Sequence, residues 1–186
     1  MMLVTNFLPE NLLISEYFAN FATETLQSLM NETNFKPQFS FDDLYVSPFT
    51  KRRGFDEATL RNVWVPLPDS RRRTGVNILD AVVDKLIQGQ EAKWIARDYG
   101  LTGAQLSTVV LALTGMRLQE LDSKWRVRRC GELLRYTNLS VPEVMRRCGF
   151  TSKTSFSRFV RDKFGVAPKR FRTRLRKSGE LNMYAL

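Results

Sequence analysis

Hydrophobic residues in the second half of the chain recur at the spacing of amphipathic helices. The pattern predicts seven helices there, near residues 78–88, 92–99, 103–114, 118–136, 141–148, 153–164 and 169–177. Local signals mark where they begin and end. Gly100 permits the positive φ at which a helix stops, and Thr102 precedes Gln105 by the spacing of a capping box. The sequence therefore predicts a mainly α-helical region.

This helical pattern occurs twice. Each copy has a helix, a turn with Gly, a large apolar residue and Thr (100–102 and 149–151), and then a second helix. The two turns are 49 residues apart, whereas Gly115 and Gly165, which follow the second helices, are 50 residues apart. Two helices joined by a tight Gly turn form a helix-turn-helix unit, whose second helix can enter a major groove. A plain helical bundle with two similar hairpins is the alternative, and the repetition within a basic segment favours the first interpretation.

The second copy carries the most specific residues of the chain. They are Cys148-Gly149-Phe150-Thr151-Ser152, Ser155-Phe156-Ser157-Arg158, Phe164-Gly165-Val166-Ala167-Pro168 and Phe171-Arg172, with looser matches at Trp125-Arg126, Cys130, Leu133-Leu134 and Leu139-Ser140. On these residues, the segment 78–174 resembles the DNA-binding domain of the AraC/XylS family of bacterial transcription regulators. The resemblance implies a seven-helix domain with two helix-turn-helix units, and it is silent on residues 1–77.

The first 77 residues have a different pattern. Apolar residues predict a long amphipathic helix at 9–30, which packs on its own domain or pairs with a second chain. Residues 39–41 and 63–65 are predicted as short strands, and 56–61 as a helical turn. We expect a small N-terminal domain (1–70), a basic linker (71–77), the double helix-turn-helix domain (78–177) and a tail (178–186). The first domain is too short for the sugar-binding barrel of many AraC/XylS proteins, which counts against small-molecule sensing.

Charge is distributed unevenly over the 186 residues. The net charge is +10 and the isoelectric point is about 10.0. Residues 77–177 contain 21 Lys and Arg against 9 Asp and Glu, a net charge of +12, so the remainder has a net charge of −2. The basic helical region therefore favours an acidic polymer as partner, and the three arginines at 71–73 are either solvated or form an arm that reaches phosphates.

Composition excludes several classes of function. The chain has no His and two Cys, so it cannot build a His-dependent triad or a Cys₄ zinc site. Cys130 and Cys148 fall on apolar helix positions, which favours buried thiols over a redox pair. There is no Gly-rich phosphate loop and no paired-acid motif. We expect no enzyme, no cofactor and no metal.

No apolar stretch approaches the roughly 18 residues of a membrane span. The absence of a basic leader argues against secretion. We therefore expect a cytoplasmic protein of the bacterial nucleoid.

The predicted second helices of the two units differ in chemistry. In the second copy, Lys153, Thr154, Ser157, Arg158 and Arg161 fall on the outward side. Hydroxyls can approach bases, Arg can bind guanine with two hydrogen bonds, and both cations can neutralise phosphates. The resemblance implies that the first four of these residues face the groove. A merely solvated polar face is the alternative.

The first copy departs from the family because residues 101–116 contain no charge. Its candidate DNA contacts are Ala104, Gln105, Ser107 and Thr108. Leu111 and Leu113 stand where the second copy has Arg161 and Lys163, so we assign them as candidates for a protein contact. This helix either reads DNA through methyls and hydroxyls or binds protein with its outer face.

We call the second helices of the two units, near 103–114 and 153–164, the reading helices. Phosphate anchors are expected outside them, at Arg126, Lys169 and Arg170, with Arg128, Arg129 and Arg172 as further candidates. The predicted connecting helix at 118–136 is about 28 Å long at 1.5 Å per residue. That length is close to the ~34 Å turn of B-DNA, so both reading helices can face successive segments of the major groove.

The sequence thus predicts a sequence-specific DNA-binding transcription regulator. A protein-interaction module of the same fold with only nonspecific nucleic-acid binding is the alternative, and a nucleic-acid enzyme lacks an assignable set of residues. The expected partners are double-stranded DNA and RNA polymerase or another regulatory protein. No membrane partner is expected, and the N-terminal helix is a candidate dimer contact.

Overall fold

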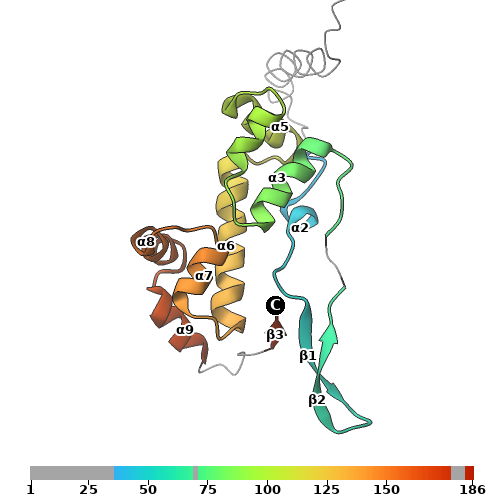
Figure 1. Ribbon diagram of the computed structural model, residues 1–186, viewed down its shortest axis with the longest axis vertical. Coiled ribbons are helices and arrows are strands. Elements are labelled where there is room, and N and C mark those ends of the chain that lie inside the picture. Colours follow the sequence, from blue (N-terminus) through green and yellow to red (C-terminus); the bar gives the residue numbers. More distant parts are fainter. Residues whose placement is uncertain (1–35, 69–70, 177–182) are drawn as a thin grey trace, which may run out of the picture.

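The computed structural model describes residues 36–68, 71–176 and 183–186 (Figure 1). Its elements are α2 (Phe41–Leu44), β1 (Lys51–Asp56), β2 (Arg61–Pro66), α3 (Asn77–Ile87), η1 (Ala92–Trp94), α4 (Ile95–Asp98), α5 (Gly103–Thr114), α6 (Leu118–Tyr136), α7 (Val141–Arg147), α8 (Lys153–Phe164), α9 (Pro168–Arg176) and β3 (Tyr184–Ala185). The helix predicted at 9–30 lies outside the described residues. Within them, no helix combines the length and the apolarity that crossing a membrane requires.

The predicted mainly helical fold is confirmed, and α5, α6 and α8 begin and end at the predicted residues. Local caps explain this agreement. The Thr102 hydroxyl accepts from the Gln105 N–H while the Gln105 side chain accepts from the Thr102 N–H, so the predicted capping box closes. Gly115 and Gly165 end α5 and α8 in the left-handed region, at φ values of 69° and 74°.

Two hydrophobic cores share the long helix α6. Its N-terminal half gives Leu121 and Trp125 to the first core, which α2, α3, α4 and α5 complete. Its C-terminal half gives Leu133 to the second core, where side chains of α7 and α8 meet it. Because one uninterrupted helix enters both cores, the two helix-turn-helix units are joined by a continuous element.

Both cysteines lie in the second core as free, buried thiols, as the sequence predicted. Contact with the Cys148 thiol and burial both raise the pKa of Cys130. The Cys130 thiol therefore stays protonated at neutral pH and behaves as a small apolar side chain.

The N-terminal segment contains a β-hairpin instead of the predicted pair of strands. The strand predicted at 39–41 is wrong, because Ser40 caps α2: its hydroxyl accepts from the Asp43 N–H, and Asp43 accepts from the Ser40 N–H. The strand at 63–65 is confirmed within β2. The helical turn predicted at 56–61 is wrong as well, because Asp56 accepts from the Ala58 N–H and closes the hairpin turn.

The chain's last described residues complete a small sheet with the order β2-β1-β3, all antiparallel. β3 was not predicted. It is held by the Arg53 N–H, which donates to the Met183 carbonyl at 2.7 Å, and by the Tyr184 ring, which stacks on Phe49 with centroids 5.0 Å apart. The predicted tail therefore returns to the N-terminal segment.

Residues of the predicted N-terminal domain pack directly into the helical region. Tyr45 lies against Trp125 with ring centroids 4.9 Å apart, and its hydroxyl donates to Glu132 at 2.8 Å. Arg128 lies over the Tyr45 ring at 4.4 Å and pairs with Asp42 and Glu132. Burial raises the pKa of Glu132, although these hydrogen bonds and the Arg128 charge oppose the rise. The division into domains itself stays a prediction.

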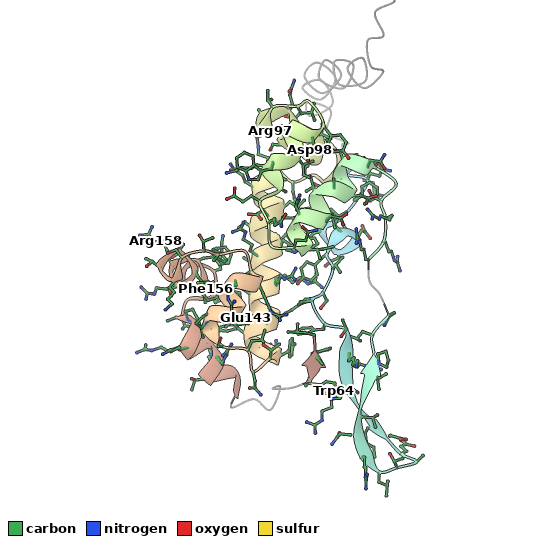
Figure 2. All side chains as sticks on the ribbon, viewed as in Figure 1. Trp64, Arg97, Asp98, Glu143, Phe156 and Arg158 are labelled. Atoms are coloured by element: carbon green, nitrogen blue, oxygen red, sulfur yellow. The ribbon has the colours of Figure 1, made fainter. Side chains whose placement is uncertain are left out.

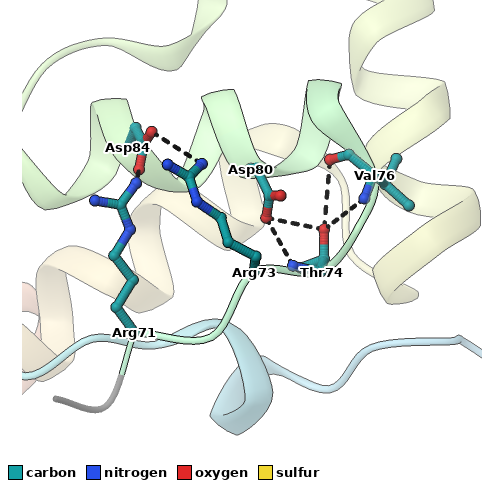
Figure 3. Close-up of polar contacts among 6 residues, drawn as sticks. All are labelled: Arg71, Arg73, Thr74, Val76, Asp80 and Asp84. Carbon is teal, nitrogen blue, oxygen red and sulfur yellow. Dashed lines mark hydrogen bonds and ion pairs between the residues drawn. The ribbon is translucent and has the colours of Figure 1, made fainter.

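The predicted basic linker is tied to α3 (Figure 3). Arg71 and Arg73 both pair with Asp84, Arg73 at 3.5 Å. Thr74 donates its backbone N–H and its hydroxyl to Asp80, at 2.8 and 3.0 Å, in the first turn of the helix. Two of the three linker arginines are thus held by an intramolecular carboxylate.

Candidate nucleic-acid interface

The second helix-turn-helix unit consists of α7, a tight turn and α8. Ser140 caps α7, and Gly149 takes a φ of 76° at its end. Phe150 then fills the angle between the helices, with its ring 5.4 Å from Phe156 and 5.0 Å from Phe159. These contacts fix how α8 projects from the second core.

The outer face of α8 is polar and cationic. Phe156 and Val160 are buried, whereas Lys153, Thr154, Arg158 and Arg161 are exposed and Ser157 is half-buried. Figure 2 shows Arg158 on the side of α8 that points away from α6, with Phe156 on the inner side. No ion pair is described for the three cations within residues 71–176. They form a positive face, and the Asp162 side chain lines the same surface hollow as Arg158.

The first unit has the same geometry and different chemistry. Gly100 takes a φ of 65° after α4, and Thr102 caps α5. Ala104 is exposed at the position that Thr154 has in α8. The Thr108 hydroxyl, at the position of Arg158, donates to the Ala104 carbonyl at 3.0 Å.

The other polar candidates of α5 also have local partners. Gln105 belongs to the capping box, and the Ser107 hydroxyl accepts from the Leu118 N–H at 3.3 Å. These hydrogen bonds occupy part of the polar capacity that the sequence alone offers to DNA. Helical periodicity alone does not reveal this local competition, although Ser and Thr commonly bond to nearby backbone.

The two leucines proposed for a protein contact lie in different surroundings. Leu113 packs against the first core, and its carbonyl accepts from the Phe39 N–H at 3.0 Å. Pro37 lies 3.3 Å from where a Cβ on Gly115 would be. The contact of Leu113 is therefore made within the chain. Leu111 is half-buried and lies on the outer side of α5, at the position of Arg161 in α8.

The basic residues outside the reading helices fall into two groups. Arg126 is engaged: its Nε donates to Asp122 at 3.0 Å, and its guanidinium lies 5.2 Å from the centroid of the Phe150 ring. Burial raises the pKa of Asp122, and the Arg126 charge opposes this rise. In contrast, Lys169 and Arg170 are exposed on α9, whose first turn has no acidic residue. Their charges are available to a partner.

The spacing between the units is set by α6. This helix has 19 residues, which is about 28 Å at 1.5 Å per residue. In Figure 1, α5 packs near one end of α6, and α8 lies beside the middle of that helix. A second link joins the units, because a Cβ on Gly149 would lie 3.1 Å from the carbonyl carbon of Gly89, just after α3.

No group of three or more His, Cys, Asp or Glu side chains suited to a metal ion occurs in the described parts of the chain.

The helix-turn-helix region matches a known protein family. Residues 95–174 match the family described as "Helix-turn-helix domain". The chain is 30% identical over 92 residues to the uncharacterized HTH-type transcriptional regulator YfiF of Bacillus subtilis (strain 168), covering 50% of this chain and 29% of that protein. The solved structure of the xylose-binding transcription activator xylR aligns with a TM-score of 0.42 and 17% identity, over 61% of this chain and 32% of that chain. The chain spans about three tenths of the length of each.

Proposed function

We propose that the chain is a DNA-binding transcription regulator that recognises a specific sequence, because residues 95–174 match a helix-turn-helix family and carry the residues that resemble the AraC/XylS DNA-binding domain. We further propose that α5 and α8 read two successive segments of the major groove. Helix-turn-helix units place their second helix in that groove, with the residues near its N-terminus at the base edges.

The observation that carries the proposal is the outer face of α8. Thr154, Arg158 and Arg161 follow one another at helical spacing and are exposed, on the side opposite the buried Phe156 and Val160. A face of this kind suits a groove, because Arg can bind guanine with two hydrogen bonds and a hydroxyl can bind a base or a phosphate. We assign Arg158 to a base, and Lys153 and Arg161 to phosphates beside it.

Binding in two segments is supported by the dimensions of α6. This helix is about 28 Å long and holds α5 and α8 apart by less than the ~34 Å turn of B-DNA, so both helices can enter the same side of a duplex that bends toward them. A single chain would then cover a site that paired repressors cover as dimers.

The test compares two cations of the same helix. Lys163 is exposed like Arg158 but lies on the side of α8 that faces α6, where it lines a surface hollow with Glu120 and Lys124. We expect Arg158→Ala to lose on the order of 1–3 kcal/mol of binding free energy on a selected site and to relax base preference. Lys163→Ala removes the same charge and should keep that preference.

The target is first obtained by selection of bound duplexes from a random pool, and each variant is then measured by fluorescence anisotropy. Equal effects of Arg158→Ala and Lys163→Ala would show that only net charge matters. That result, together with a selection that yields no motif, would favour the second candidate, a protein-interaction module that touches nucleic acid nonspecifically. The observation that keeps this candidate in view is the uncharged outer face of α5 with Leu111.

A further inference from the structure

The sheet presents one face to the helices and the other away from them. In the antiparallel register, Arg52 is opposite Val65 on β2 and opposite Tyr184 on β3. Tyr184 packs on Phe49 and Tyr136, with ring centroids 5.0 and 4.9 Å apart, so this row faces the second core. Side chains alternate along a strand, and opposite residues share a face. The next row, formed by Arg53 and its cross-strand neighbours, therefore faces away from the helices.

This outward face combines apolar and cationic side chains. Trp64 and Met183 flank Arg53 in one row, and Phe55 and Lys51 occupy the rows on either side. The three apolar side chains are 61% (Phe55), 47% (Trp64) and 43% (Met183) exposed. Single exposed apolar residues are ordinary, but three in adjacent rows of one sheet form a patch that a partner can cover.

The edge of β2 has unused backbone groups. Leu67 donates its N–H to the Thr50 carbonyl at 2.8 Å. In an antiparallel pair every second residue bonds to the neighbouring strand, so Val65, Val63 and Arg61 are the residues of β2 that bond to β1. The backbone N–H and C=O groups of Asn62 and Trp64 then point away from β1, to the open side of β2. β2 ends the sheet on that side among the described strands. Such an edge is a template for another extended chain.

The charges of the hairpin select the partner. Residues 51–66 contain four cations, Lys51, Arg52, Arg53 and Arg61, against Asp56 and Glu57. All four cations are exposed, and no ion pair is described for them within residues 36–68 and 71–176. Pairing β2 with β2 of a second copy would bring together two hairpins that each have a net charge of +2, from four cations and two acidic residues. An acidic chain would instead be attracted to this face.

We propose that the hairpin binds an extended, acidic segment of a partner protein, which adds to the edge of β2 as a strand. An added strand lies next to β2, so its side chains on the outward face would cover Trp64, and acidic side chains there would reach across Trp64 toward Lys51 and Arg53 on β1. Its apolar side chains would alternate with these and lie on the other face, beside Val63 and Val65. Backbone hydrogen bonds supply affinity in this mode and the side chains supply specificity. The hairpin extends from the opposite side of α6 from α8, so the partner and DNA can be bound together (Figure 1). The binding does not depend on the function proposed above.

The experiment uses the full chain and a fluorescein-labelled peptide in which glutamate and valine alternate. Binding is followed by fluorescence anisotropy. The two variants Arg53→Glu and Arg52→Glu make the same charge change in neighbouring residues of β1, one on the outward face and one on the face toward the helices. We expect Arg53→Glu to weaken binding by about tenfold or more, and Arg52→Glu to have a clearly smaller effect. Lys51→Glu is a second variant on the outward face, and circular dichroism checks that each variant is folded.

Three control ligands complete the test. The same peptide with lysine in place of glutamate, and the glutamate peptide with N-methylated amides at alternate positions, should both fail to bind, because the first reverses the charge and the second removes the edge hydrogen bonds. Saturable binding of the methylated peptide, equal effects of Arg53→Glu and Arg52→Glu, or no binding of the glutamate peptide would each overturn the proposal. Labelled oligothymidylate that binds this face more tightly than the peptide would assign it to single-stranded nucleic acid instead. A dimer that Arg53→Glu dissociates would assign it to a second copy.

Discussion

Replacing Gly149 with Ala should destabilise the fold much more than the same change at Gly165. Both glycines follow a helix at almost the same φ, 76° and 74°, so an added Cβ has the same intrinsic cost at the two positions. For an L residue in the left-handed region this cost is about 1–2 kcal/mol. The backbone strain therefore cancels when the unfolding free energies of the two variants are compared, and the difference reports the surroundings of each glycine.

The surroundings of the two glycines differ. Nothing lies within 4 Å of a Cβ on Gly165. A Cβ on Gly149 would overlap the carbonyl oxygen of Gly89 and lie 3.1 Å from its carbonyl carbon. These are backbone atoms of the turn after α3, and that turn cannot avoid the methyl group by a rotamer change. Overpacking of this kind typically costs a further 1–3 kcal/mol, so we expect a total loss of about 2–5 kcal/mol for Gly149→Ala.

Urea unfolding of the full chain, followed by tryptophan fluorescence, measures both variants, since Trp125 is buried in the first core. We expect a small shift of the midpoint for Gly165→Ala and a shift at least about twice as large for Gly149→Ala, with similar slopes. Equal shifts would refute the reasoning, because they would mean that Gly89 and Gly149 do not touch and that α6 alone joins the two units.

Three other predictions follow from the described contacts. The double variant Lys169→Ala/Arg170→Ala should make the slope of log K against log salt less negative by about 2, measured on one duplex, if each residue neutralises one phosphate. Leu111→Arg, which gives α5 the charge that Arg161 gives α8, should tighten binding to all duplexes and steepen that slope by about 1, unless the outer side of Leu111 is covered. The pKa of Glu132 is raised by burial, so its folded form binds protons more tightly than the unfolded chain, and stability should fall as the pH rises through this raised range. As the pH rises from about 4 to about 7, the urea midpoint of the unsubstituted chain should therefore fall relative to that of Glu132→Gln. A relative rise of the unsubstituted chain's midpoint would contradict the role of burial.

The helices were predictable because their signals are local. Thr102 and Gln105 carry the capping box of α5 within four residues, and Gly115 ends the same helix. The spacing that would have identified α2, Ser40 and Asp43, was also present in the sequence. The two aromatic residues on either side of Ser40, Phe39 and Phe41, obscured this signal. Apolar residues in so short a stretch fit a helix or a strand equally well.

The remaining features depend on contacts between distant residues. β3 exists because Met183 and Tyr184 meet β1 and Phe49, and nothing in the last residues of the chain specifies this pairing. The ion pair between Arg126 and Asp122 could have been predicted from the sequence, because the two residues have the i,i+4 spacing of helical ion pairs. The contact of Arg126 with Phe150, in contrast, requires the angle between α6 and the turn before α8.

The sequence and the structure both show that α5 and α8 differ in chemistry. The sequence alone shows that α5 lacks charge, and the structure adds that the Thr108 hydroxyl bonds to its own helix, at 3.0 Å from the Ala104 carbonyl. Corresponding positions in α8 carry Thr154 and Arg158. Phosphate neutralisation supplies a large share of the affinity of DNA-binding domains, so under the proposed function α8 and α9 would hold the duplex and α5 would contribute contacts to methyl groups and groove shape. The two segments would then be bound unequally, and the link through α6 and the Gly89–Gly149 contact would let the anchored half position the weaker one.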